Sequence, residues 1–194
     1  MSLPDPLDPA SNITPGRLTA IYIATLAVLI AITSVGGDNA TKDMIRASIQ
    51  AADTYSFYQA KTIRQTTIRA LADDFEARLA DPAVPAPVRQ KLQEKLGNYR
   101  ATADRYESEP STGEGKKELI AKARQFEAER ELALKRDPYF DTAGALLQIA
   151  VVLASASLII AGPILLWTSI LLGVLGTLLM FNGFLLLVAI PFLS

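Results

Sequence analysis

Residues 31–61, AITSVGGDNATKDMIRASIQAADTYSFYQAK, decide the fold, because an apolar run ends here and a charged segment with helical patterning begins. The apolar run covers residues 18–35, eighteen residues without a charge. This approaches the about 20 residues that a helix needs to cross a bilayer. Residues 142–194 contain no Asp, Glu, Lys or Arg, a length that allows two further crossings. The sequence therefore predicts three membrane helices, with a charged segment between the first and the second.

The expected architecture is an all-α membrane protein with a long, coiled-coil-like helical hairpin as the soluble domain between the first two membrane helices. Its parts are a tail at 1–17, a membrane helix at 18–35, a hairpin domain at 38–136, and membrane helices at 142–161 and 164–191. The tail has two acids against one Arg and no A-x-A motif precedes Gly36, so the first helix is expected to be a retained anchor rather than a signal peptide.

Gly162 and Pro163 mark the turn between the last two membrane helices, since proline suits the first turn of a new helix. The alternative is a single helix that kinks at Pro163. Such a helix would be about 75 Å long, far beyond the thickness of a bilayer. The turn is therefore the preferred interpretation.

Two breaks divide the charged segment into helices expected at 38–80, 87–107 and 115–136. The first break, DPAVPAP, contains three prolines, and the second, EPSTGEG, makes Gly113 and Gly115 hinge candidates. At about 1.5 Å per residue, the first helix is nearly as long as the other two together. One helix is therefore expected to run outward and two collinear helices to return.

An apolar seam on the first hairpin helix is expected to pack against the returning helices. The seam has Ser56 and Thr67 as polar gaps and otherwise consists of Ile45, Ile49, Ala52, Ala60, Ile63, Leu71, Phe75 and Leu79. Tyr55 and Phe57 fall on nearly opposite faces and Tyr58 lies near Tyr55, which indicates two contact surfaces. Because a two-helix hairpin offers little core for its length, we expect these aromatic residues to support association of several copies.

Small residues follow one face of each predicted membrane helix, which is typical of close helix packing in lipid. They are Ala20, Ala24, Ala27, Ala31 and Ser34 in the first helix, Ala143, Ala150, Ala154, Ser157 and Ala161 in the second, and Gly173, Gly176 and Gly183 in the third. Gly36 and Gly37 leave two alternatives open. Either the chain bends there and Asp38 caps a new helix, which is the favoured alternative, or the glycines allow another helix to approach closely.

The residue types present exclude most site chemistry. Neither Cys nor His occurs, which removes disulfides, thiolate catalysis and the usual zinc sites. Of the 19 basic and 20 acidic residues only Asp5, Asp8 and Arg17 lie outside residues 38–141, so that segment holds 18 of each sign. Such a neutral mixture lacks the cationic stripe that binds nucleic acid. We expect no catalytic residue, no metal, no cofactor and no nucleic-acid partner.

Two functions stay open. The first is a non-enzymatic membrane scaffold or accessory subunit, surrounded by lipid, that forms a homo-oligomer or docks another membrane protein complex through its hairpin. The alternative is a small channel or transporter component with a pore lined by Gln148, Ser157 and Asn182. The predicted membrane helices contain no carboxylate or ammonium group, which counts against ion-coupled transport.

Basic residues next to the membrane helices predict the orientation of the chain. On the hairpin side these residues are Lys42, Arg46, Arg130, Lys135 and Arg136, whereas the other side has only Arg17. The positive-inside rule therefore predicts a cytoplasmic hairpin and an N-terminus outside.

Three blocks of the chain carry a family resemblance. They are ITSVGGDNATKD at 32–43, ADTYSFYQAKTIRQ at 52–65 and RDPYFDTAGALLQIAVVLASASLI at 136–159. In these blocks the chain resembles an uncharacterised bacterial membrane family, domain of unknown function 4337, and the likeness extends from about residue 18 to the C-terminus. The resemblance implies a bacterial inner-membrane protein and supplies no activity or active-site residues.

Overall fold

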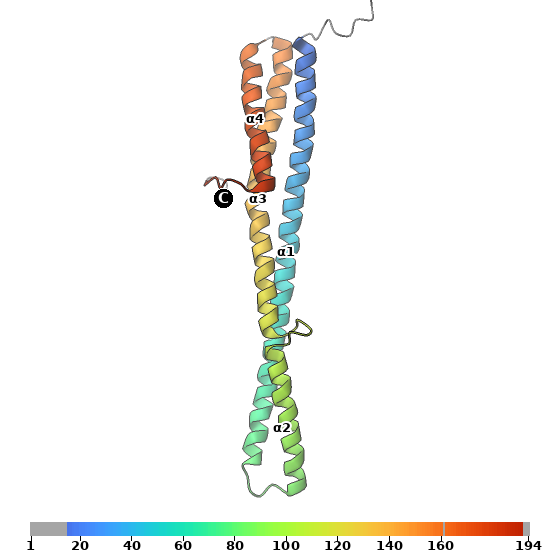
Figure 1. The fold of residues 1–194 in the computed structure, drawn as a ribbon, viewed down its shortest axis with the longest axis vertical. Coiled ribbons are helices and arrows are strands. Elements are labelled where there is room, and N and C mark those ends of the chain that lie inside the picture. Colours follow the sequence, from blue (N-terminus) through green and yellow to red (C-terminus); the bar gives the residue numbers. More distant parts are fainter. Residues whose placement is uncertain (1–14, 161, 192–194) are drawn as a thin grey trace, which may run out of the picture. The chain divides into compact units, whose positions relative to one another are not determined.

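The computed structural model describes residues 15–160 and 162–191 as four helices, with no strand in these ranges (Figure 1). They are α1 (Pro15–Leu79), α2 (Ala86–Glu107), α3 (Lys116–Ile160) and α4 (Pro163–Leu185). The expected all-helical fold is confirmed. Residues 1–14 of the expected tail and Ala161 lie outside the described residues, and residues 15–17 already belong to α1.

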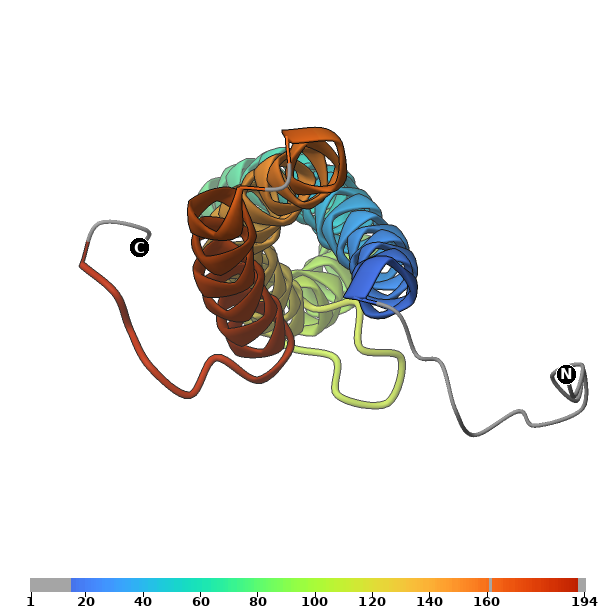
Figure 2. The ribbon, with the colours of Figure 1, turned by 90° about the horizontal axis from the view of Figure 1, so that it is seen from above.

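The chain divides into two compact units, and α1 and α3 contribute to both of them. Unit 1 comprises the described residues up to Asp43 and from Leu132 onward, and unit 2 comprises Met44–Glu131. Unit 1 contains three helices that are long and apolar enough to cross a membrane, by length and composition: the first part of α1, the last part of α3, and α4. Seen end-on, these three lie around one axis (Figure 2).

Phe140 of α3 packs against glycines of both neighbouring helices in unit 1. A Cβ added at Gly36 of α1 would lie 2.6 Å from the Phe140 ring, and one added at Gly183 of α4 would lie 3.0 Å from it. Phe184 closes the contact edge-to-face, with ring centroids 4.8 Å apart. The buried Phe140 ring therefore requires two positions without a side chain.

This contact explains the glycine pair without a bend. α1 continues as a helix through Gly36 and Gly37, so the break that we favoured, with Asp38 as a cap, does not occur in the structure. The other alternative, close approach of a neighbouring helix, is the one observed.

Further contacts in unit 1 use the small residues of α3 and α4. Ser169 of α4 is fully buried; its hydroxyl donates to the Ala150 carbonyl of α3 at 2.6 Å. The Tyr22 hydroxyl of α1 donates to the Ser169 carbonyl at 2.9 Å, so one polar group of each helix meets at this point. A Cβ added at Gly173 would lie 2.6 Å from that hydroxyl.

The small-residue stripe predicted on the first membrane helix is not the face that packs inside unit 1. All five of its residues are exposed: Ala20, Ala24, Ala27, Ala31 and Ser34. The buried face of this part of α1 instead carries Thr19, Leu26, Thr33, Gly36 and Ala40. Lipid-facing and helix-facing positions cannot be separated by polarity here, because both sets are small or apolar.

Two helix boundaries also differ from those expected. α3 runs through Pro138 as one helix, although helices ending at 136 and starting at 142 were expected there. α4 ends at Leu185 and not at 191, because Leu186 adopts a left-handed backbone with φ of 49°. The Asn182 side chain then replaces helical hydrogen bonds: it accepts from the Val188 N–H at 2.9 Å and donates to the Val188 carbonyl at 2.8 Å.

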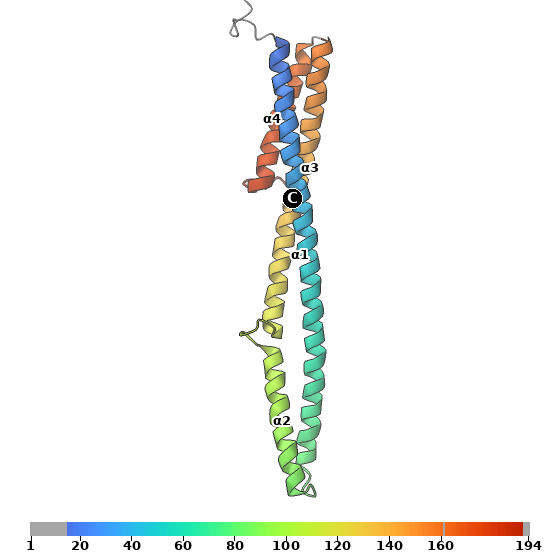
Figure 3. The ribbon, with the colours of Figure 1, turned by 90° about the vertical axis from the view of Figure 1, so that its right-hand side faces the viewer.

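In unit 2, α2 and the start of α3 lie one after the other along α1, with a projecting loop between them (Figure 3). The helices end where the two sequence breaks were expected: α1 at Leu79, before the prolines, and α2 at Glu107, before residues 108–115. Phe75 of α1 stacks on Tyr99 of α2 at a centroid distance of 5.5 Å. Gly113 has φ of +69°, a backbone conformation that favours glycine.

Most of the apolar seam predicted for α1 faces outward, whereas Phe75 and Leu79 at its end are half-buried and Phe75 packs against α2 as expected. Ile45, Ile49, Ile63 and Leu71 are 49%, 56%, 67% and 41% exposed. The residues of α1 that are buried in unit 2 are Ala47, Ala51, Thr54, Lys61, Gln65 and Ala72. At 100° per residue, the two sets lie on opposite faces of the helix. We call Ile45, Ile49, Ala52, Ser56, Ala60, Ile63, Thr67 and Leu71 the outer face of α1.

Gly36→Ala and Gly183→Ala are each expected to destabilise unit 1 by about 1–3 kcal/mol, because the added methyl group overpacks the buried Phe140 ring. Gly144→Ala is the matched control in α3, since its nearest neighbour would be the Thr33 methyl group at 3.8 Å. Unfolding in mixed detergent micelles with increasing SDS measures the effect. Equal stability of all three variants would contradict the packing described for Phe140.

Candidate functional site: a buried polar clasp and an exposed apolar face

Two polar residues of α1 are buried where α2 ends and α3 begins. Lys61 is 4% exposed and Gln65 is 2% exposed, one helical turn apart on the face that packs inside unit 2. Long polar side chains are seldom buried unless they have partners. Their partners come from the α2–α3 loop and the adjoining helix ends. We call Lys61, Gln65, Glu107, Lys116 and Glu118 the polar clasp.

Lys61 holds the α2–α3 loop to α1. Its ammonium group lies 3.6 Å from the Glu114 carboxylate and 4.0 Å from that of Glu109. It also lies over the rings of Phe57 and Tyr106, at 5.2 and 5.6 Å from their centroids. Two carboxylates and two aromatic faces therefore replace the water that this cation loses on burial.

Gln65 joins all three helices of unit 2. Its amide nitrogen donates to the Ala103 carbonyl at 2.8 Å and to the Glu107 carboxylate at 3.0 Å. Its amide oxygen accepts from the Lys116 ammonium group at 2.9 Å. The hydrogen bond from Gln65, followed by that from Lys116, holds the pKa of Glu107 below its ordinary value.

Glu118 fixes the loop from the α3 side. Its carboxylate accepts from the Ser108 hydroxyl at 2.6 Å and from the Glu109 amide at 3.1 Å. These hydrogen bonds, the first above all, lower the pKa of Glu118. A side chain at Gly115 would collide with the Glu118 carboxylate and the Glu109 amide, so this hinge candidate is a close-approach position.

The three aromatic residues expected to mediate association all contact the chain itself. Tyr55 donates to the Glu127 carboxylate of α3 at 3.0 Å, and this hydrogen bond raises the pKa of Tyr55. Phe57 lies under the Lys61 ammonium group, and Tyr58 under that of Lys116 at 5.7 Å. The three residues flank the buried face of α1, and a role in binding another molecule stays a prediction.

The residues proposed to line a pore are not brought together. Asn182 binds the segment after α4, as described above. Gln148 lines a surface pocket of about 350 Å³ with Thr33 and Asp38, whereas Ser157 lines a different pocket of about 340 Å³ beside Gly162 and Pro163. The channel alternative stays a prediction.

One exposed apolar surface of unit 2 is the outer face of α1. Exposed charged residues border its branched side chains on α1; they include Arg46, Asp53 and Arg64. A shallow hollow of about 570 Å³ lies at one edge of this face; it is lined by Ile63, Thr67 and Leu71 of the face and by Thr62, Thr66 and Ala70 beside it. Much of the surface of these apolar groups is exposed in the described residues, so another molecule can contact them.

The sequence contains a signal for the polar clasp that a hydrophobic pattern does not find. Lys61 and Gln65 continue the helical stripe of Ala47, Ala51 and Thr54 at steps of three, four and seven residues. Neither residue is apolar, so a pattern search finds this stripe only if it also counts polar side chains as residues that can be buried. Among the described residues, no three His, Cys, Asp or Glu side chains lie close enough to hold a metal ion.

Acid is expected to open the polar clasp. Because the pKa values of Glu107 and Glu118 are lowered from 4.5, the unfolded chain binds more protons than the folded chain below pH 4.5. The clasp therefore stabilises unit 2 fully above that pH. This stabilisation is lost as the pH falls through the lowered pKa values of Glu107 and Glu118. Glu118→Gln should lower the melting temperature at pH 7, and the difference from wild type should shrink toward pH 3. Glu94→Gln on α2 is the control; a difference that does not change with pH would contradict this expectation.

Comparison with known proteins identifies a family. No curated protein and no solved structure matched the chain. Residues 16–186 match the family described as domain of unknown function (DUF4337), a range that includes α2, α3, α4 and all of α1 except Pro15. The protein therefore belongs to the DUF4337 family.

Proposed function

We propose that this protein is a non-enzymatic membrane scaffold, held in the bilayer by unit 1, that associates with itself and docks a partner, as an accessory subunit of a membrane complex, through unit 2. The observation that carries this proposal is the outer face of α1. Four branched apolar side chains, 41–67% exposed, stand on a segment rich in charge. Lipid covers such groups in a membrane helix, whereas outside the membrane a row of exposed apolar groups is typical of a surface that binds another protein.

The membrane-spanning part supports an anchor more than a conduit. Its buried glycines pack α4 closely against α3: Gly176 contacts Leu147 and Gly183 contacts Phe140. Its buried hydroxyl groups are used in hydrogen bonds: Ser169 to Ala150, Ser157 to Ala154 and Thr33 to Leu29. Polar groups that line a path for ions or water would instead face a common space.

The polar groups of unit 2 support a scaffold more than an enzyme. The pKa shifts of Tyr55, Glu107 and Glu118 each arise chiefly from a hydrogen bond between parts of the hairpin. Shifted pKa values mark candidate catalytic groups only where the group faces a cleft that admits a substrate. Here the same groups stiffen the hairpin along the α2–α3 loop, which suits a rigid arm.

We place unit 2 in the cytoplasm of a bacterial inner membrane, with the N-terminus outside, because the basic residues gather on that side of the apolar helices. Fusions at positions 85 and 194 test the orientation. A reporter that works only in the cytoplasm should be active at both positions, and one that works only outside should be inactive at both. The opposite pattern would reverse the orientation without affecting the scaffold proposal.

Gentle extraction from the native membrane tests the scaffold proposal. The protein is expected to have a mass that is a multiple of 20.9 kDa, or to retain a partner in stoichiometric amount. Mass photometry or native mass spectrometry at micromolar concentration gives the mass, and the same sample identifies partners. A monomer without a stoichiometric partner would overturn the proposal.

A further inference from the structure

The outer face of α1 repeats every eleven residues. Ile45, Ile49 and Ala52 are followed at this interval by Ser56, Ala60 and Ile63, and then by Thr67 and Leu71. Three positions in eleven residues correspond to about 3.67 residues per turn, close to the 3.6 of an α-helix. The face therefore stays on one side of α1 through unit 2 and can contact a straight partner helix along its length.

The centre of this face suits contact with an identical face. Two parallel copies of one helix place like residues opposite each other, so a charged residue at the centre would meet its own charge. None of the eight residues of the outer face is charged. The hollow between Ile63 and Leu71 offers space in which a side chain from a second helix can insert.

The flanks of the face fit a parallel pair as well. In parallel packing, a residue on one flank lies near the residue five positions later on the opposite flank of the partner. These pairs include Ser48 with Asp53 and Gln59 with Arg64. Each of these pairs brings a neutral polar group to a charged group, so neither pair has like-charge repulsion and both can form hydrogen bonds.

Membrane anchoring determines the direction of such a pair. Two copies inserted in one membrane with the same orientation direct their α1 helices the same way along the membrane normal. An antiparallel pair would require copies in two facing membranes. A second copy in the same membrane is therefore the occupant that fits both the uncharged centre and the complementary flanks.

We propose that α1 packs in parallel and in register against α1 of a second copy, through the outer face from Ile45 to Leu71. This rests on the proposed scaffold function and adds to it the surface and the direction of self-association. The polar clasp and the α2–α3 loop lie at the opposite face of α1, so the proposed interface does not cover them.

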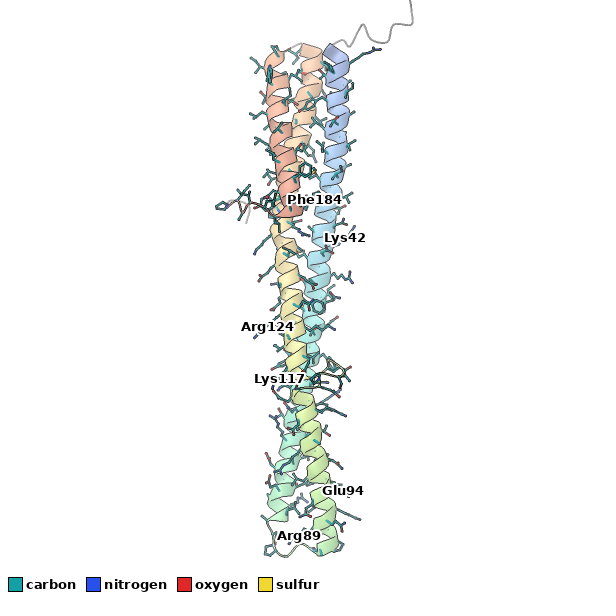
Figure 4. The ribbon with its side chains drawn as sticks, in the orientation of Figure 1. Lys42, Arg89, Glu94, Lys117, Arg124 and Phe184 are labelled. Atoms are coloured by element: carbon teal, nitrogen blue, oxygen red, sulfur yellow. The ribbon has the colours of Figure 1, made fainter. Side chains whose placement is uncertain are left out.

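Single cysteines test the contact cleanly, because the chain has no cysteine of its own. Ile49→Cys and Ile63→Cys lie in the outer face, whereas Glu94→Cys on α2 and Arg124→Cys on α3 are exposed controls; the sites of both controls are labelled in Figure 4. Each full-length variant is treated in native membranes with a short bis-maleimide. We expect several-fold more covalent dimer from each outer-face variant than from either control.

The crosslinking pattern tests the direction and the surface of the contact, whereas the mass of the assembly tests self-association. Dimer from mixed Ile49→Cys and Thr67→Cys chains without dimer from Ile49→Cys alone would indicate antiparallel packing and overturn the inference. An oligomer by mass that crosslinks equally or better at position 94 or 124 would overturn the inference alone. A monomer without a partner would overturn the scaffold proposal with it.

A disruptive variant checks the same contact by another readout. Ile63→Glu places a like charge at the centre of the proposed pair and should reduce the assembly to monomers with helix content unchanged by circular dichroism. Ala101→Glu, on an exposed position of α2, is the matched control and should retain the assembly. Retention of the full mass by Ile63→Glu would contradict the proposed interface.

Discussion

The fit of Phe140 between Gly36 and Gly183 sets the distances among the three helices of unit 1. The ring of α3 meets backbone on α1 and on α4, and Phe184 covers its edge. In lipid, helices gain little from hiding apolar side chains from one another, so close packing of this kind must hold them together. The contacts of Gly173 with Tyr22 and of Gly176 with Leu147 follow the same principle.

The long helix α1 uses its two sides differently. One side is buried, and it carries residues such as Thr33, Gly36, Ala47, Ala51 and Gln65, most of them small or polar. The opposite side in unit 2 carries the larger branched residues, and these are exposed. Small residues allow α2 and α3 to approach α1 closely. The larger branched residues become closely packed only when another surface covers them. This division of α1 is the basis of the scaffold proposal.

The polar clasp takes the place of an apolar core in the middle of unit 2. A hairpin two helices wide buries little apolar area per residue, so hydrogen bonds and ion pairs take a larger share in fixing its geometry. Lys61 and Gln65 are satisfied by groups that arrive from the α2–α3 loop, from α2 and from α3. The loop of residues 108–115 is therefore held to α1 through the Glu109 and Glu114 side chains, and to α3 through Ser108 and the Glu109 amide.

By itself the sequence determined the helices, the breaks after Leu79 and Glu107, the turn before Pro163 and the three apolar segments, because prolines, glycines and runs of apolar residues act locally. Only the tertiary structure decided which face of α1 turns inward. Both faces repeat with a helical period, and the prediction that the more apolar one is buried was wrong between Ile45 and Leu71, because burial there followed small size and hydrogen-bond partners. The continuity of α1 through Gly36 and Gly37, and of α3 through Pro138, likewise depended on neighbours. Packing across helices can override local signals for a break, since the stabilisation from close packing of neighbouring helices exceeds the local cost of a residue that disfavours the helix.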